Sequence, residues 1–515
     1  MQGFGMPTGG YNRIRKGVNM ENSMKIKLSA YGLISAVSFI YLILPYNPGI
    51  SVPVFAIIQF FSIYVVVNKR EEVKNIKGLY IFIPIFILSL NYYISGSYLW
   101  RIPNFFCIMV LYSVMILIIT DEFPIREMNL KFIYNIIENV IASFINFRVP
   151  FKWINSYNQD NVKRKLTKRI LLGIFISLPC ITFLLIMLSS ADMVFSSKVE
   201  NTMGWFFKSL NFSYIFKFVY GIIAGLYLFG LLYIVFSEKI SAKLEIITNA
   251  ANSITAGKQK KGDTIVINIL LFSILLVYTS FVFIQFKYLF AGSALPDNLN
   301  YSEYARRGFF ELIFLSFLNV GLILITISLF RENIYDQRDK WSNMTEIFMI
   351  YLCMITFIML ISSFYRMSLY DQEYGFTRLR VLVYGFLIFE SIGLAMTFIF
   401  ILKPKFNIVA VYLVIGLCYY LSLNVIQIDN IIAKRNIDMY FSGETDSIDI
   451  DYLMNNLSVD AAPQIMRLKD SDNADILTKY KANLYFKGIN EYNDNNSNWQ
   501  SSNYSFSRAL KLIND

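Results

Sequence analysis

Residues 379–402 read LRVLVYGFLIFESIGLAMTFIFIL, and this stretch decides the fold class. As an α-helix with a rise of 1.5 Å per residue it would be about 36 Å long. The hydrocarbon core of a bilayer is about 30 Å thick, so the stretch is long enough to cross it. Only Arg380 and Glu390 in it carry charge. The stretch therefore predicts a transmembrane helix.

Ten further stretches have a similar length and few charges. Together the eleven predicted spans are 28–45, 50–68, 79–98, 103–120, 170–190, 215–236, 264–290, 309–330, 343–365, 379–402 and 407–427. Only a short turn containing Pro45 and Pro48 separates the first two, which leaves a re-entrant hairpin open there. The fold class predicted is all-α: a polytopic helical transmembrane bundle of about 11 spans with a small helical extracytoplasmic C-terminal tail.

Composition supports this class and excludes others. Of the 515 residues, 56% are hydrophobic and only 16% are charged, against about 25% charged in an average soluble protein. This excludes an ordinary cytosolic enzyme, a disordered protein and a fibrous protein. The chain has no histidine, which removes the commonest general base and the commonest zinc ligand. Its four cysteines stand singly in hydrophobic runs, so we predict no disulfide framework, metal or cofactor.

The spans divide the chain into five parts. Residues 1–27 are predicted to be a disordered cytoplasmic N-terminus, and 28–120 hold the first four spans. Residues 121–169 form a cytoplasmic loop, in which apolar residues at helical spacing over 129–147 predict an amphipathic helix on the membrane surface. Seven spans follow in 170–427. The tail, 428–515, is the soluble part, with several short helices that we expect to dock on the membrane part.

The positions of Lys and Arg predict the orientation. With the N-terminus in the cytoplasm, the inner side carries 28 of them and the outer side 9. Cytoplasmic loops of membrane proteins are rich in these residues, so the chain is predicted to lie in the plasma membrane with its tail outside. Basic inner loops also account for the net charge of +11, so nucleic acid is not expected as a partner.

The few outer basic residues form the first candidate site. The candidate ligand-binding residues are Arg306, Arg307, Glu311, Arg366, Tyr370, Tyr374, Arg378 and Arg380. Guanidinium groups bind phosphate and carboxylate groups through two hydrogen bonds, so an anionic small molecule or a lipid headgroup is the expected partner, beside membrane lipid itself. The alternative is structural: Arg and Glu pair across neighbouring helix ends, and the tyrosines form an interfacial belt.

Glu390 is the second candidate, because it is the one acid near the middle of a span. An ionisable group at bilayer depth costs several kcal/mol unless it is paired or protonated. Its predicted role is coupling to a proton or cation. The alternative is a buried, hydrogen-bonded structural glutamate.

Several strings in the second half resemble a known family. They include Tyr304 to Leu312 (YARRGFFEL), Tyr374 to Arg380 (YGFTRLR) and Trp499 to Asn503 (WQSSN). Over residues 170–515 the chain resembles a bacterial membrane-protein family catalogued as domain of unknown function 4173. The resemblance implies a multi-spanning bacterial protein with a soluble tail and no assigned activity.

These observations predict a non-enzymatic, transporter-like or envelope-sensing protein that recognises an anionic ligand at its outer face. No GxxxxGK[ST], GxGxxG or GxSxG string occurs, so nucleotide-binding and hydrolase motifs are missing. The alternative function is a membrane-embedded transferase for a lipid-linked substrate. In that case Glu303, Glu311 or an Asp would act as the base, and the arginines would hold a pyrophosphate.

Overall fold

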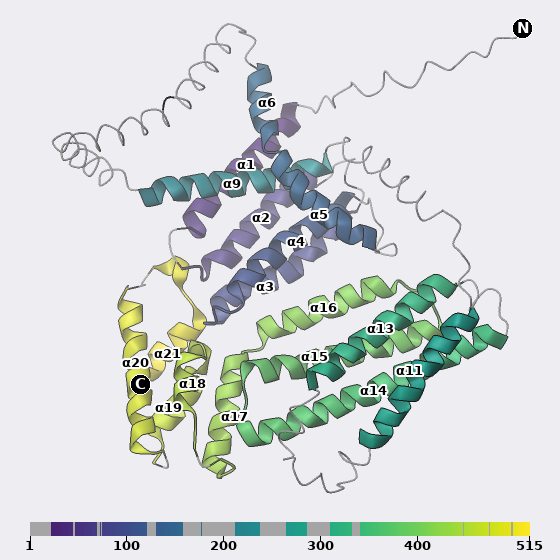
Figure 1. Cartoon of the computed structure of the whole chain (residues 1–515). Helices are drawn as coiled ribbons and strands as arrows, with labels where there is room; N and C mark the ends of the chain where they lie inside the picture. The colour runs from purple at the N-terminus through teal and green to yellow at the C-terminus, as the bar shows by residue number, and fades with distance from the viewer. Residues whose placement is uncertain are drawn as a thin grey trace, which may run out of the picture. The chain divides into compact units, whose positions relative to one another are not determined.

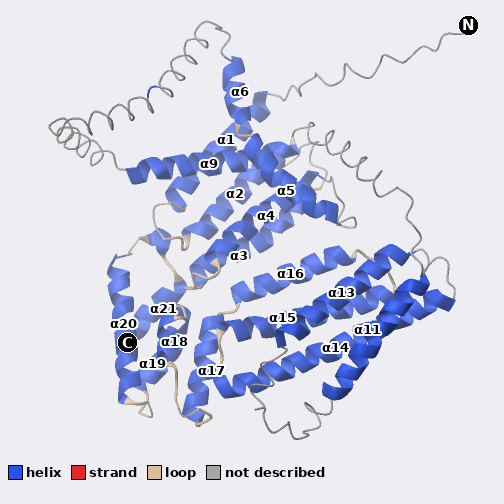
Figure 2. Ribbon diagram, in the orientation of Figure 1, coloured by secondary structure: helices blue, strands red, loops and turns tan. Residues whose placement is uncertain are grey.

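A computed structural model gives the structure of most of the chain. It describes residues 22–44, 47–68, 75–120, 130–157, 212–236, 264–285, 309–331, 340–445, 447–472, 474–495 and 498–514, with residues 73 and 177. These residues are almost entirely helical and contain no strand (Figure 2). They divide into two compact units, each described here by itself.

Nine helices among the described residues are long and apolar enough to cross a membrane. They coincide with nine of the eleven predicted spans, and the all-α polytopic fold class is confirmed. Of the two remaining spans, 50–68 corresponds to α2 (Ser51–Val67), which has 17 residues and a length of about 25 Å. The other, 170–190, lies outside the described residues apart from residue 177.

The first unit contains α1 (Asn22–Leu42), α2, most of α5 (Leu130–Ile145), α6 (Arg148–Tyr157), α9 (Phe212–Val235) and the second half of α4 (Arg101–Thr120). Small residues let α1 and α9 approach closely, as is common between membrane helices. A Cβ placed at Gly225 would lie 2.7 Å from the Gly32 carbonyl oxygen. Between α1 and α2, the Ser35 hydroxyl donates to Gln59 Oε1 at 2.9 Å.

Helix α5 places its polar side chains inside the first unit. Asn135, Asn139 and Ser143 are buried, whereas the apolar Ile137 and Ile141 are exposed. The polar residues are spaced four apart, so they share one face of the helix. The sequence predicts this amphipathic helix, and the structure adds that its polar side faces protein. In 239–257, Ile240, Leu244 and Ile247 at helical spacing also predict a surface helix, and this segment lies outside the described residues.

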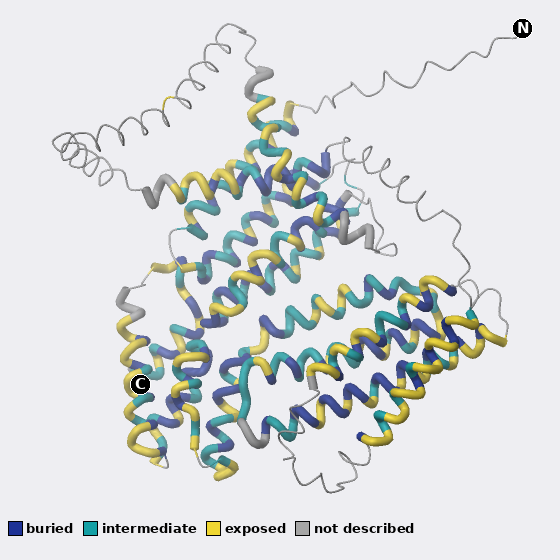
Figure 3. Tube along the Cα trace, viewed as in Figure 1, coloured by how far each residue is buried: buried dark blue, intermediate teal, exposed yellow. Residues whose placement is uncertain are grey.

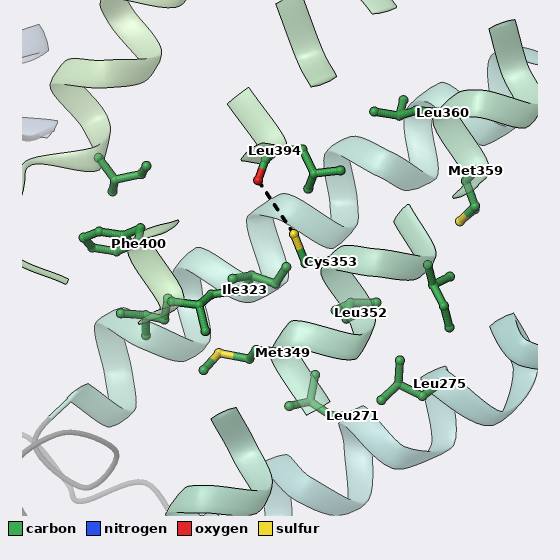
Figure 4. Packing of buried hydrophobic residues seen from close by; sticks show 14 of the residues in the cluster. Leu271, Leu275, Ile323, Met349, Leu352, Cys353, Met359, Leu360, Leu394 and Phe400 are labelled. Atoms are coloured by element: carbon green, nitrogen blue, oxygen red, sulfur yellow. Dashed lines mark hydrogen bonds between the residues drawn. The ribbon is translucent and has the colours of Figure 1, made fainter. Parts of the chain in front are cut away.

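The second unit contains a bundle of apolar helices and the C-terminal helices. The bundle comprises α11 (Thr264–Gln285), α13 (Phe309–Arg331), α14 (Lys340–Tyr374), α15 (Arg378–Leu402) and α16 (Ile408–Val425). The unit also includes most of α3 (Phe82–Ile94) and the first half of α4. Helix α14 has 35 residues and packs against α11, α13 and α15 (Figure 1). Its buried face includes Met349, Leu352 and Cys353, whose thiol lies against the Leu394 carbonyl of α15 (Figure 4).

Exposed residues on the bundle are largely apolar, as expected for helices that face lipid. Val266 and Phe283 of α11 and Phe314 of α13 are examples (Figure 3). The apolar residues of these spans are thus divided between the protein core and the surface.

The tail folds into helices at one end of the bundle (Figure 1). They are α17 (Ile428–Ser442), α18 (Ile450–Asn455), α19 (Ala462–Asp470), α20 (Ile476–Asn495) and α21 (Tyr504–Asn514). Ile432, Leu453, Ile465 and Leu468 are fully buried in their core, and Leu423 of α16 belongs to the same apolar cluster. The C-terminal helices are therefore packed directly onto the membrane helices of this unit.

Candidate functional site

The turn between α14 and α15 arranges one group of the predicted arginine and tyrosine residues. Gly375 begins the turn with φ of +69°, a conformation that suits glycine because it has no Cβ. Arg380 Nη1 donates to the Gly375 carbonyl oxygen. The same guanidinium lies 4.1 Å from the centre of the Tyr370 ring and its Nε is 3.4 Å from Asp371 Oδ1. The turn thus positions Arg380 directly.

Arg366 lies beside this group and is equally buried. It precedes Tyr370 by four residues on α14, so the two side chains share a face of the helix. Arg366 is 5% exposed, Asp371 2% and Arg380 8%. Charged groups are rarely buried so deeply unless they are paired or functional. We call Arg366, Tyr370, Asp371 and Arg380 the arginine end of the bundle.

Arg378 forms a separate contact, with the C-terminal helices. Its Nε donates to Asp429 Oδ1 at 2.6 Å and its Nη2 to Asp429 Oδ2 at 2.5 Å, a bidentate ion pair. Asp429 Oδ2 also accepts from the Ser458 N–H at 2.8 Å, and the Arg378 N–H donates to the Tyr452 hydroxyl at 3.1 Å. Arg378 therefore joins the start of α15 to α17 and to the segments around α18.

Asp460 joins the C-terminal helices to the segment between α3 and α4. Its carboxylate accepts from the Ser95 hydroxyl at 2.6 Å and from the Gly96 N–H at 2.7 Å. Asn503 donates to the carbonyl oxygens of Tyr92 and Ser95, at 3.1 and 2.8 Å. These bonds satisfy carbonyl groups at the end of α3 that the helix itself leaves without donors.

A small cavity lies between these contacts. Arg378, Asp429, Asp460 and Ser95 are among its lining residues, and its free volume is about 10 Å³, about what one water molecule needs. The phenol of Tyr485 is buried nearby, and burial raises its pKa, with the charges of Asp460 and Asp429 adding to the rise. The phenol is therefore neutral at physiological pH, and the cavity has room for a solvent molecule but not for an organic ligand.

Glu390 lies inside the bundle, on α15. The Ser316 hydroxyl of α13 contacts Glu390 Oε1. It also lies 2.7 Å from the Ile313 carbonyl oxygen. A hydroxyl has only one proton. If Ser316 donates it to Ile313, the contact with Glu390 needs a proton on the carboxyl group. Glu390 Oε2 is buried and has no hydrogen-bond partner among the described residues.

Further buried polar groups connect the bundle helices at other depths. One turn beyond Ser316 on α13, Asn319 accepts from the Tyr278 hydroxyl at 2.9 Å and donates to the Thr356 hydroxyl at 3.1 Å. Near the start of α14, the Thr345 hydroxyl donates to Asn268 Oδ1 at 2.8 Å. Thr345 and Thr356 are eleven residues apart on α14, or about 16 Å along its axis.

The structure describes only some of the predicted site residues. Arg306 and Arg307 lie outside the described residues, as does the side chain of Tyr374. Glu311 is exposed at the start of α13. Tyr370 and Arg380 come together at the arginine end, and Arg366 is buried one turn earlier on α14, whereas Arg378 forms its bidentate ion pair with Asp429. No group of three or more metal-ligating side chains occurs in the described part of the chain.

Sequence reasoning missed the acidic partners. Asp371, Asp429 and Asp460 were not among the candidate site residues. In the sequence, Asp371 stands between Arg366 and Arg378, near the end of a predicted span. This position could have indicated Asp371 as a partner for one of the arginines. Asp429 and Asp460 are far from their contacts in sequence, so spacing gives no such signal.

The fold and these contacts define a polytopic α-helical membrane protein with buried polar groups inside its bundle. The chain belongs to the family described as domain of unknown function 4153, whose model matches residues 82–468. No curated protein and no solved structure matches the chain.

The resemblance to domain of unknown function 4173 is therefore wrong, because the matching family model is a different one. Two of the strings that suggested it, YARRGFFEL and YGFTRLR, combine arginines with aromatic residues next to predicted spans. Such combinations arise in many membrane proteins, since arginine and tyrosine both favour the membrane interface. They indicate a membrane helix end and do not discriminate between families.

Proposed function

We propose that this protein is a non-enzymatic, transporter-like protein of the plasma membrane. Glu390 accepts and releases a proton inside the bundle of α11 and α13–α16, and the arginine end binds an anionic ligand. The observation that carries the proposal is the position of Glu390, a carboxyl group in mid-span with one oxygen bonded to Ser316 and the other buried. Ionisable groups at such depth are typical of proton relays in pumps and transporters.

The surrounding polar groups support this role. A proton needs hydrogen-bonding groups on its way to and from Glu390, and α11, α13 and α14 supply such groups within an otherwise apolar core. Ser316 and Asn319 share a face of α13, and Asn319 continues the contacts to Thr356 and Tyr278. Buried polar side chains of this number would be costly in a bundle whose only task was packing.

The arginine end supports the anionic ligand. A guanidinium group has five N–H donors, and Arg380 uses Nη1 for Gly375 and Nε for Asp371. Stacking on Tyr370 holds its plane fixed, which favours bidentate recognition of a phosphate or carboxylate group. Arg366 places a second guanidinium on the face of α14 that carries Tyr370.

Carbodiimide labelling tests the protonated state of Glu390. Dicyclohexylcarbodiimide is apolar and reacts with protonated carboxyl groups, so we expect it to modify Glu390 of the full chain in membrane vesicles. Glu311 is the control, because it is exposed at a helix end and should react far less. Mass spectrometry of the digested protein locates the adduct. No adduct on Glu390, with the reagent active on a reference protein, would contradict the proposal.

We further propose that the C-terminal helices lie outside the cell. The segments around Ser95, Phe376 and Ile426 are all on the outer side of the predicted topology, and all adjoin the C-terminal helices. Alkaline phosphatase fused after Asp515 should be active, and a green fluorescent protein at the same place should be dark. The reverse pattern would place the C-terminal helices in the cytoplasm and overturn this orientation.

A further inference from the structure

One residue of the C-terminal helices binds both backbone polar groups of a single residue, Phe376, in the turn between two membrane helices. Asn436 of α17 accepts from the Phe376 N–H at 2.7 Å and donates to the Phe376 carbonyl oxygen at 2.9 Å. The side chain thus binds the turn between α14 and α15 as a neighbouring strand would. Any Cβ on the preceding residue, Gly375, would lie 3.1 Å from Asn436 Oδ1, so the fit is close.

This turn is also what positions Arg380. The carbonyl oxygen of Gly375 accepts from Arg380 Nη1, and this carbonyl belongs to the same peptide group as the Phe376 N–H that Asn436 binds. A continuous set of contacts therefore runs from α17 through the turn to the guanidinium, and from there to Tyr370 and Asp371. Coupling between two parts of a protein requires such a connection, with an element that both parts bias.

Two further contacts hold the same turn from the C-terminal side. The Tyr452 hydroxyl accepts from the Arg378 N–H, and the Arg378 side chain pairs with Asp429. Three residues from two of the C-terminal helices, α17 and α18, thus contact a turn of only a few residues. Packing alone needs no such concentration of polar contacts, because apolar residues already join the two parts.

We infer that Asn436 is a positioning residue through which the C-terminal helices control the arginine end of the bundle. With Asn436 engaged, the turn holds Arg380 buried against Tyr370 and Asp371. When the C-terminal helices shift, the turn loosens and Arg380 becomes accessible. A ligand or protein that binds the C-terminal helices would then change the affinity of the arginine end for its anion. This inference rests on the proposed anion site.

The experiment uses the full chain in lipid nanodiscs and two readouts. Hydrogen exchange measures the protection of the Phe376 amide, and phenylglyoxal, which modifies arginine, measures the accessibility of Arg380 by mass spectrometry. Asn436→Ala should raise both rates about five- to thirtyfold, the effect of losing one to two kcal/mol of stabilisation. The control is Asn430→Ala, on the same helix, whose amide oxygen accepts only from Gln464 among the described contacts; it should leave both rates unchanged.

Tyr452→Phe is the second variant, for the case in which Asn436→Ala does not fold. It removes a different contact to the same turn and should raise both rates in the same direction. Faster exchange at Phe376 with unchanged Arg380 reactivity would overturn the inference, because the turn would then not control the arginine. Unchanged rates in both readouts would overturn it as well.

A third measurement separates this inference from the proposed function. Binding is measured with inorganic phosphate and, in parallel, with nanodiscs containing phosphatidylglycerol or only phosphatidylcholine. A changed affinity of Asn436→Ala for either anion supports the control of the site and identifies the source of the anion, whereas an unchanged affinity, when the wild-type chain does bind, overturns it. If the wild-type chain binds neither, the proposed anion site fails, while the Arg380 readout still decides whether Asn436 positions the arginine.

Discussion

Replacing Arg378 by alanine should lower the free energy of unfolding by about 3 kcal/mol. Removal of one partner from a buried ion pair costs about 3–5 kcal/mol, because the other charge is left in the interior without compensation. Asp429 is 3% exposed and would be that charge, while the Arg378 side chain is 28% exposed, which places the loss at the lower end. Thermal unfolding of the full chain in detergent measures the effect.

The two residues of this pair should differ in how much their replacement lowers the free energy of unfolding. Asp429→Asn leaves Arg378 uncompensated, but the arginine reaches solvent, so the loss should be smaller than for Arg378→Ala. The control is Arg435→Ala. Arg435 and its partner Glu444 are 3.5 Å apart and 46% and 51% exposed, and such exposed pairs contribute about 0–1 kcal/mol. Equal effects of Arg378→Ala and Arg435→Ala would contradict a structural role for the Arg378–Asp429 pair.

Replacing Glu390 by glutamine should abolish coupled proton movement while leaving the fold intact. Glutamine retains an oxygen that can accept from Ser316 but cannot bind and release a proton. Proton uptake into vesicles containing the full chain should fall to the level of empty vesicles. The measurement is the fluorescence of a pH-sensitive dye trapped in the vesicle lumen, recorded after an anion gradient is imposed.

Stability distinguishes this role from a structural one. If Glu390 only packs and bonds to Ser316, the glutamine variant should transport normally, or lose activity together with its fold. We expect an unchanged midpoint of thermal unfolding and no proton uptake. Glu444→Gln is the control, because Glu444 is 51% exposed just after α17, and it should behave as the wild type in both measurements. Normal uptake by the Glu390→Gln variant would exclude Glu390 from the proton path.

The spans could be predicted from sequence because each is a local run of apolar residues. The bilayer sets the required length, and no contact with a distant segment is needed to recognise it. The polar face of α5 was also visible in its spacing. Its direction was not, since a stripe of Asn135, Asn139 and Ser143 suits water or a protein interior equally well, and only the neighbouring helices decide.

The partners of the candidate residues could not be predicted, because they come from distant parts of the chain. Arg378 and Asp429 are separated by 51 positions, and Ser95 and Asp460 by 365. The sequence led us to consider glutamates near the helix ends as partners of the arginines. In the structure the partners are Asp371, on the preceding helix, and Asp429, on α17. A buried aspartate in a soluble-looking segment shows its role only when the fold brings the arginine to it.

Under the proposed function, an anion and a proton move together through this protein. The wild-type chain in vesicles that hold a pH-sensitive dye tests this movement when phosphate is added outside. Arginine binds phosphate well, so phosphate is the simplest anion to use. We expect acidification of the lumen in vesicles with the protein and none in empty vesicles. The same trace from both kinds of vesicle, across a series of phosphate concentrations, would contradict it.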